Sequence, residues 1–227
     1  MNHLVSFYLT SKPDPQRGDV WQFDKFDEIS DTWYESAWQH INKLSVKIFT
    51  DFSADRYDGD KFILTHPEDS PLSLNDWRYV ALQYWLDGIP DDDWVLMTDI
   101  SDVEFFKDPY EYMNDPDAIY IGSNDTWREK PKFHKKLYDV ISKSIADEWM
   151  DNPVINPGIL GGKAKTLRKF VSHFAELLNH TRAYNSNMVM ANRLAYFYDY
   201  KIITGYPLHT KFKKHESADS GAYIRHK

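Results

Sequence analysis

Two acidic residues follow a near-continuous apolar run of this sequence. The run 94–97 has the length and composition of a strand covered on both faces, and Asp99 and Asp102 come directly after it. Mg²⁺ and Mn²⁺ prefer carboxylate oxygens and share their remaining positions with phosphates and water. The pair therefore suits a metal ion bound to a diphosphate. The plainer alternative is that Asp99 caps a turn and Asp102 is a solvated loop residue.

Two arginines and a glycine-rich segment are further candidates. Arg17 follows the first apolar run and Arg78 stands at the start of an expected helix, so each lies near an expected ligand edge. The guanidinium fork suits phosphate oxygens, and a surface ion pair is the alternative. Gly158, Gly161 and Gly162 would let the backbone pass close to a sugar, although a plain turn explains them nearly as well. Their spacing is not the Gly-x-Gly-x-x-Gly of dinucleotide binders.

Strand and helix patterns alternate along most of the chain. Apolar runs of strand length occur at 4–9, 46–49, 62–64, 94–97, 118–121, 154–155 and 201–203. Helical spacing predicts helices from Ser30 or Asp31 to about 44, from 74 to a stop at Gly88, and over 133–150, 167–178 and 188–198. This alternation predicts an α/β fold with a mostly parallel central sheet and helices on both faces. Ligands of such sheets bind at the carboxyl ends of the strands, so the residues just after each apolar run are the ones to examine.

Length, charge and cysteine content narrow the class of protein. The 227 residues contain no linker long enough to split the chain, so we expect one domain. Zero cysteines exclude a disulfide framework, a zinc-thiolate site and a cysteine nucleophile. A formal charge of −8 excludes a globally basic nucleic-acid coat, although the stretch 201–227 is locally basic. We find no run long and apolar enough to span a membrane and no signal-peptide pattern, so we expect a cytoplasmic protein.

Several ordered landmarks together resemble a known family. The segment 95–109 reads as three apolar residues, Thr-Asp-x-x-Asp-Val, an aromatic stretch and Asp-Pro. The other landmarks are Asp14-Pro15-Gln16-Arg17-Gly18, Asn75-Asp76-Trp77-Arg78, the Asn-x-Gly-x-x-Gly segment 156–162, the helix start 187–192 and the His-containing segment 205–212. In this order the sequence resembles nucleotide-diphospho-sugar glycosyltransferases of the GT-A fold. It is similar above all to small transferases encoded by bacteriophages and bacteria.

The resemblance implies a fold and an activity. The fold would be a single GT-A (Rossmann-like) domain over 1–227, with a nucleotide-binding half 1–103, an acceptor-side half 104–210 and a basic tail 211–227. The activity would be metal-dependent transfer of a sugar from a UDP- or GDP-sugar to an acceptor hydroxyl, with Mn²⁺ or Mg²⁺ as the cofactor. A phage-encoded enzyme would work in the host cytoplasm.

The resemblance also implies roles for particular residues. Donor binding would involve Thr10, Gln16, Arg17, Asp76, Arg78, Asp99, Lys211 and Lys214; acceptor or sugar binding Asn156, Gly158, Gly161, Gly162 and Asn187; catalysis Asn187 and Arg78; and metal binding Asp99, Asp102 and His209. His215 and His226 are the next choices for the metal ligand. Asp76 could equally be a helix N-cap, and Lys211 and Lys214 could belong to a solvated basic tail.

Two departures from the family pattern leave the chemistry open. The general motif of the fold is Asp-x-Asp, whereas this chain has Asp-x-x-Asp, and Asn187 stands where many relatives carry Asp. An amide cannot act as a base, whereas inverting chemistry needs a carboxylate base near the acceptor. Asp125, Asp151 and Glu216 are conceivable bases. Inversion and retention therefore both remain open at this stage.

The acceptor and two rival functions also stay open from the sequence. A hydroxymethylated DNA base and a host polysaccharide are both compatible acceptors, and a base within DNA would have to be flipped or single-stranded. One rival is a non-catalytic sugar- or nucleotide-binding module on the same fold. The other is a metal-dependent phosphohydrolase, which would normally carry more acidic ligands in dispersed motifs. The sequence does not indicate an oligomeric state.

Overall fold

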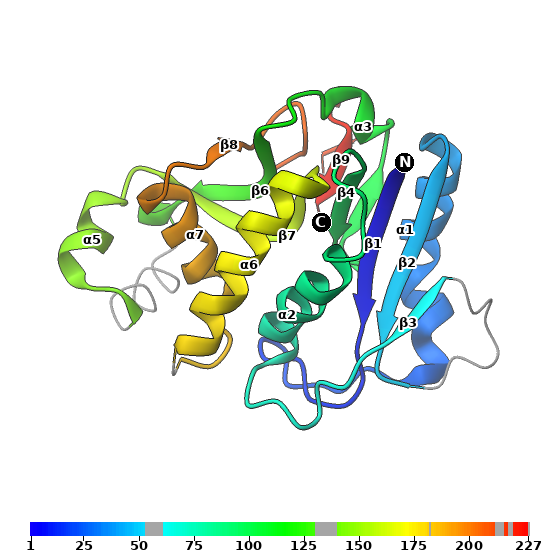
Figure 1. The fold of residues 1–227 in the computed structure, drawn as a ribbon, viewed down its shortest axis with the longest axis horizontal. Helices are drawn as coiled ribbons and strands as arrows, with labels where there is room; N and C mark the ends of the chain where they lie inside the picture. Colours follow the sequence, from blue (N-terminus) through cyan, green and yellow to red (C-terminus); the bar gives the residue numbers. More distant parts are fainter. Residues whose placement is uncertain (53–60, 130–139, 182, 212–215, 218–219, 227) are drawn as a thin grey trace.

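The protein is built around one large mixed sheet. The computed structural model describes residues 1–52, 61–129, 140–181, 183–211, 216–217 and 220–226. Seven strands lie in the order β3-β2-β1-β4-β7-β6-β8 (Figure 1). Their bounds are β1 Asn2–Tyr8, β2 Leu44–Thr50, β3 Phe62–Leu64, β4 Trp94–Thr98, β6 Ala118–Thr126, β7 Pro153–Lys163 and β8 Lys201–Ile203. β3, β2, β1 and β4 are parallel, β7 runs antiparallel to both of its neighbours, and β8 is parallel to β6. The expected α/β class with a mostly parallel sheet is confirmed.

Helices cover both faces of the sheet. On one face pack α2 (Leu74–Leu86), α6 (Ala164–His180) and α7 (Asn187–Phe197). On the other face lie α1 (Phe26–His40) and a second, two-stranded sheet of β5 (Val103–Phe105) and β9 (Ile224–His226). The short helices α3 (Pro109–Tyr112) and α5 (Lys143–Glu148) and the 3-10 turns Phe23–Lys25 and Trp127–Glu129 complete the described elements. Because both faces are covered, the inner strands read as continuous apolar runs.

Alternate residues of the inner strands serve the two faces. Leu4 and Leu96 belong to the cluster under α1, whereas their neighbours Val5 and Val95 belong to the cluster under α2 and α6, and all four are fully buried. This alternation follows from the strand period of two residues. β1 and β4 are thereby held firmly from both sides. The loops that leave their carboxyl ends therefore start from fixed positions.

Several element boundaries differ from the sequence expectations. α1 begins at Phe26, before the expected caps Ser30 and Asp31, because a 3-10 turn leads directly into it. The segment 156–162 is part of the continuous strand β7 and not a turn. The basic tail ends in β9, which the sequence did not predict. The helix expected over 133–150 lies partly outside the described residues, and its described part contains α5.

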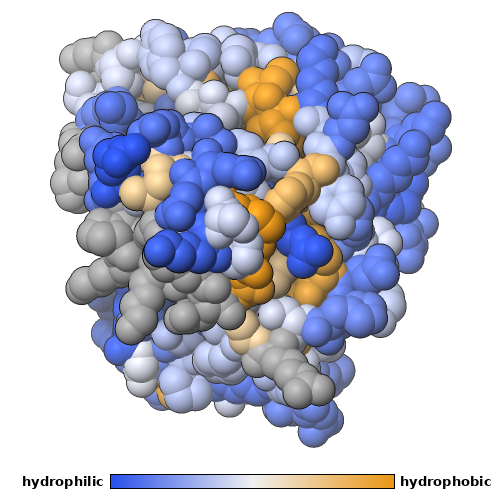
Figure 2. All heavy atoms as spheres, turned by 90° about the vertical axis from the view of Figure 1, so that its left-hand side faces the viewer, coloured by the Kyte–Doolittle hydropathy of each residue, from blue (hydrophilic) through white to orange (hydrophobic). Residues whose placement is uncertain are grey.

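A third, smaller core cluster lies between α5, β7 and α7. Its buried members are Trp127, Ala146, Trp149, Val154 and Val189. Figure 2 looks onto this side of the molecule and shows apolar side chains at the surface only in a narrow band, surrounded by hydrophilic ones. No described helix is long and apolar enough to cross a membrane.

Candidate functional site

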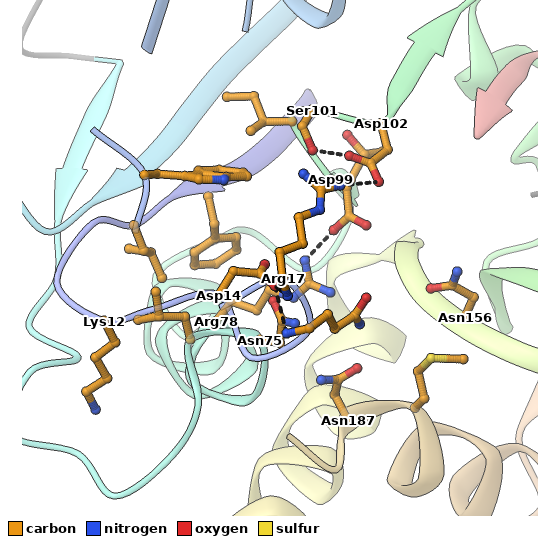
Figure 3. Close-up of a pocket in the computed structure, with 18 of the residues that line it drawn as sticks. Lys12, Asp14, Arg17, Asn75, Arg78, Asp99, Ser101, Asp102, Asn156 and Asn187 are labelled. Carbon is orange, nitrogen blue, oxygen red and sulfur yellow. Dashed lines mark hydrogen bonds and ion pairs between the residues drawn. The ribbon is translucent and has the colours of Figure 1, made fainter. Parts of the chain in front are cut away.

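A pocket opens at the carboxyl ends of β1 and β4, between the start of α2 and the start of α7 (Figure 3). This is the edge at which parallel α/β sheets bind their ligands. The pocket is lined by Phe7, Leu9, Lys12, Asp14, Gln16, Arg17, Trp21, Leu74, Asn75, Arg78, Thr98, Asp99, Ile100, Ser101, Asp102, Asn124, Asn156, Asn187 and Met188. Of the residues expected at the site, Gln16, Arg17, Arg78, Asp99, Asp102, Asn156 and Asn187 meet here.

Two charge pairs form the floor of the pocket. Arg78 Nη1 donates a hydrogen bond to Asp99 Oδ1, and its side chain is 14% exposed. Arg17 Nη2 lies 3.7 Å from Asp102 Oδ2 and its side chain is 56% exposed. The Ser101 hydroxyl also donates to Asp102. Both arginines expected near a ligand edge therefore face the two carboxylates, and Arg17 has the solvent access to meet an incoming anion.

Charge and burial act in opposite directions on Asp99. Burial alone would raise the pKa of this carboxyl, but the positive charge of Arg78, together with the nearby His226, outweighs burial and lowers the pKa to about 2. Burial likewise disfavours the charge of Arg78, and Asp99 outweighs it, so the pKa of Arg78 is raised. The pair is therefore ionised at neutral pH. Asp99 therefore offers a permanent carboxylate to a cation or to a hydroxyl donor.

A histidine from the last strand lies beside Asp99. His226 Nε2 is 3.7 Å from Asp99 Oδ2, and the histidine side chain is fully buried. β9 brings it there by pairing with β5, which starts directly after Asp102, and the ion pair between Arg225 and Glu104 joins the same two strands. In the antiparallel pairing of β5 and β9, Val103 lies opposite His226. His226, which the sequence indicated with His215 as a next choice for the metal ligand, thus lies beside Asp99.

His209 has a different environment from the one expected of a metal ligand. Its Nδ1 hydrogen-bonds Thr210 O at 2.7 Å, and its Nε2 accepts from the backbone N–H groups of Ser123 and Gly205 at 3.1 and 3.0 Å. Both ring nitrogens are therefore engaged by the backbone. Burial lowers the pKa of His209 to about 4, so its ring is neutral near neutral pH. The imidazole ties the segment after β8 to β6 and has no nitrogen left to bind a metal ion.

The fit of a divalent metal ion depends on Asp99, Asp102 and His226. Within the described part of the chain, no three acidic or histidine side chains form a ready metal-binding cluster. The ligand types nonetheless suit Mn²⁺ or Mg²⁺, since two carboxylates supply hard oxygens and an imidazole supplies nitrogen. A Cβ added at Gly158 would overlap Asp99 Oδ2 and lie 3.0 Å from His226 Cε1. The glycine thus keeps room for these two side chains to face each other.

Amide side chains form the wall opposite the charge pairs. Asn124, Asn156, Asn187 and Met188 line this side, which carries no charged group among the described residues. Asn156 Oδ1 accepts from Gly158 N at 3.0 Å. The buried Asn192 of α7 fixes Ile155, the residue before Asn156, by forming hydrogen bonds with both Ile155 N and Ile155 O at 2.9 Å. Uncharged amides in fixed positions are suited to binding hydroxyl groups.

Three expected site residues lie away from the pocket surface. Asp76 is fully buried and accepts hydrogen bonds from the start of α7. Thr10 turns its N–H and hydroxyl to the carboxylate of Asp51, at 2.8 to 2.9 Å, and so shapes the loop after β1. Lys211 is exposed and does not line the pocket. Lys214 and His215 lie outside the described residues.

Two expected sugar-binding glycines have a packing role. Gly161 and Gly162 lie in the middle of β7, opposite Leu96 and Val95 of β4. A Cβ at Gly161 would come within 2.9 Å of Val95 O, and one at Gly162 within 3.0 Å of Ala118 O. The absent side chains let β7 pack closely between its neighbours. Neither residue lines the pocket.

The sequence did not single out Lys12, Trp21 and Asn124, which line the pocket. Lys12 Nζ donates to the carbonyls of Ser70 and Leu72 and so ties the loop after β1 to the segment before α2. Its place in a polar loop after the first strand was the available signal. Trp21 contacts the ring of Tyr8 and offers an aromatic face at the same end of the pocket. The conceivable bases Asp125, Asp151 and Glu216 do not line it.

The parallel half-sheet and the antiparallel β7 match the GT-A fold of nucleotide-sugar glycosyltransferases. The galactosyltransferase LgtC, solved with donor and acceptor sugar analogs, is similar over 99% of this chain and 86% of its own, with a TM-score of 0.58 and 14% identity. An active-site mutant of LgtC gives a TM-score of 0.57 at 13% identity, with the same coverage. A glycosyltransferase involved in glycosylation of the major capsid of PBCV-1 gives 0.55 at 15%, over 99% of this chain and 92% of its own.

These likenesses establish the fold. The sequence matches no protein-family model and no curated protein. The activity of this chain therefore has to be argued from its own pocket.

Proposed function

We propose that the protein transfers a sugar from a nucleotide-diphosphate donor to an acceptor hydroxyl. The observation that carries this proposal is the meeting of Asp99, Asp102, Arg17 and Arg78 in one pocket at the carboxyl ends of β1 and β4. A nucleotide sugar carries two phosphates whose charge grows as the sugar leaves, so it needs cations fixed at that position. The opposite wall of amides suits the neutral, hydroxyl-rich sugar.

The two ends of the pocket would bind different parts of the donor. Trp21 and the loop from Lys12 to Arg17 would hold the nucleoside and its nearer phosphate, since they combine an aromatic face with a solvent-accessible guanidinium. Arg78 would meet the sugar-linked phosphate from the floor of the pocket. Asn156 and Asn187 would bind sugar hydroxyls. UDP and GDP sugars are the two donor classes that we propose.

We further propose that Mn²⁺ or Mg²⁺ is held by Asp99, Asp102 and His226. Bound there, the ion would neutralise the charge that develops on the departing diphosphate. His226 takes this role in the proposal because it lies beside Asp99, whereas both nitrogens of His209 bind backbone groups. A modified DNA base and a glycan both remain candidate acceptors.

A donor panel tests the proposal directly. Titration calorimetry with UDP- and GDP-sugars, each with Mn²⁺ and with EDTA, should find one donor that binds with metal and loses at least about ten-fold in affinity without it. Asp102→Ala should remove most of this metal-dependent affinity. Asp92→Ala, which changes an exposed aspartate outside the pocket, should not.

Two results would contradict the proposal. Equal affinity in EDTA and in Mn²⁺ would remove the metal from it. Release of free sugar at the same rate with and without any acceptor, measured by mass spectrometry, would indicate a hydrolase in place of a transferase. Metal-dependent binding with no turnover on glycan or DNA acceptors would favour a non-catalytic binding module.

A further inference from the structure

A buried carboxylate joins the two helices whose starts flank the pocket. Asp76, in the first turn of α2, is fully buried. Its Oδ1 accepts from the backbone N–H of Asn187 at 2.8 Å, and its Oδ2 from that of Ser186 at 3.1 Å. Ser186 and Asn187 are the N-cap and first residue of α7. Two helix starts with their partial positive charge therefore share one carboxylate, which is a favourable place for its charge.

The same carboxylate also binds the side chain of Asn187. Asn187 Nδ2 donates to Asp76 Oδ1 at 3.1 Å and to Asn185 Oδ1 at 3.1 Å. Asn185 has a left-handed backbone, with φ of 56°, which turns the chain so that the next two N–H groups point at Asp76. Asparagine is one of the few residues that adopt this conformation readily.

These contacts fix which end of the Asn187 amide faces the pocket. A carboxylate only accepts hydrogen bonds, so the NH₂ end must point to Asp76. Both of its hydrogens are used, by Asp76 and Asn185. Asn187 lines the pocket, and in Figure 3 its side chain lies on the same side of the cavity as Asn156. The carbonyl oxygen is therefore the end that is presented to a ligand.

We propose that Asp76 is a positioning residue that orients Asn187 as a hydrogen-bond acceptor for one hydroxyl of the transferred sugar or the acceptor. The proposal rests on the proposed function, because it assigns a hydroxyl ligand to that pocket. An acceptor held in this way selects a sugar that carries a hydroxyl at one position. An analog that lacks this hydroxyl leaves the amide oxygen unpaired and is disfavoured.

Asp76 also couples the two sides of the pocket. Arg78 follows two residues later on α2 and is bound to Asp99, while Asn187 starts α7. A shift of α7 against α2 would therefore move the hydroxyl-binding amide relative to the phosphate-binding guanidinium. Errors of about 1 Å in such positions cost about a hundred-fold in rate.

Hydrogen exchange tests the positioning without relying on activity. In Asp76→Asn, the backbone N–H groups of Ser186 and Asn187 should exchange at least about ten-fold faster than in wild type, measured by NMR. Asp108→Asn is the matched control. Asp108 is also a buried aspartate that accepts backbone N–H groups, from Tyr110 and Asn42, but it lies outside the pocket. Unchanged exchange at 186 and 187 in Asp76→Asn would overturn the proposal.

Kinetics test whether Asp76 acts through Asn187. Asp76→Asn should lower kcat about a hundred-fold and leave the Kd for the bare nucleoside diphosphate within about two-fold, since Arg17 and Trp21 are untouched. The double variant Asp76→Asn/Asn187→Ala should be no slower than Asn187→Ala alone. Additive losses would show that Asp76 acts by another route and would overturn the proposal.

The two readouts separate the possible failures. If wild type transfers no sugar while exchange at 186 and 187 responds as expected, the proposed function fails and the structural role of Asp76 stands. If Asp76→Asn does not fold, wild type itself gives the test. The side-chain NH₂ of Asn187 should then exchange more slowly than that of Asn124. In a panel of deoxy-sugar donors, the absence of one particular hydroxyl should lower the turnover of wild type but not that of Asn187→Ala.

Discussion

Arg78 and Asp99 form an ion pair in which each side chain keeps the other charged inside the pocket. The pair is mostly shielded from water, and Arg78 Nε is buried without a hydrogen-bond partner. A lone charge in this position would be costly, so each partner is needed for the other to stay ionised. The unused Nε leaves the guanidinium one further hydrogen bond to give.

Removing Arg78 should therefore lower turnover much more than removing an exposed arginine. If the proposed transfer is correct, we expect kcat with the preferred donor to fall by roughly 10² to 10³ in Arg78→Ala, because a fixed cation would be lost where charge would develop. Arg128→Ala is the control, since Arg128 pairs with Asp151 at 2.9 Å but both side chains are more than half exposed. Steady-state kinetics, with melting temperature to monitor folding, measure the difference. Normal turnover in Arg78→Ala would make Arg78 purely structural.

His209 should make stability depend on pH. Burial lowers its pKa to about 4, against an ordinary value of about 6.5 in the unfolded chain. Between these values the unfolded state binds a proton that the folded state does not, so the free energy of unfolding falls as the pH drops from about 6.5 to about 4. Protonation would also break the two bonds that Nε2 accepts from Ser123 and Gly205.

Denaturant titrations at pH 7 and pH 5 measure this effect. Wild type should lose about 2 kcal/mol more between these pH values than His209→Gln, which has no titrating group at this position. Equal losses in the two proteins would show that His209 does not contribute to the pH dependence.

At the scale of elements, β7 and β9 bring residues together that are far apart in the sequence. β7 passes Gly158 beside Asp99, and β9 places His226 beside the same carboxylate. Gly158→Ala should therefore lower metal-dependent nucleotide affinity by at least about ten-fold, because its Cβ would displace Asp99 or His226. Gly88→Ala is the control, since that Cβ would meet only Trp85 O at 3.6 Å. Calorimetry with both variants, checked for equal melting temperatures, decides whether the close approach matters.

The sequence allowed prediction of those parts that depend on local pattern. Apolar runs located β1, β2, β4 and β6, and the strand-end rule brought Arg17, Asp99 and Asp102 to one edge. It could not locate β9, because three residues in a polar tail become a strand only by pairing with β5. The same limit explains why His209 was preferred to His226. Which histidine reaches the carboxylates depends on long-range pairing, and spacing from neighbouring motifs does not encode it.

At the scale of the whole molecule, the five inner strands of the large sheet belong to both large core clusters. Buried side chains lie on the α1 side and on the α2–α6 side in each of β1, β2, β4, β6 and β7. We therefore expect the slowest hydrogen exchange in these five strands, at one common free energy, with faster exchange in the edge strands β3 and β8. Native-state exchange by NMR measures this. Two separate limiting free energies for 1–103 and 104–210 would mean that the halves unfold independently.

The position of β9 has a practical consequence for anyone who purifies this protein. The carboxyl-terminal strand ends at His226, beside Asp99, so a polyhistidine tag joined there would place additional imidazoles near the carboxylates that we propose as metal ligands. Metal titrations on such a fusion would measure metal binding by the tag as well as by the pocket. The amino terminus lies just before β1, at the opposite end of that strand from the pocket, where Met1 pairs with Asp93. A tag at that end, removed by a protease before calorimetry, keeps the measurement to the protein itself.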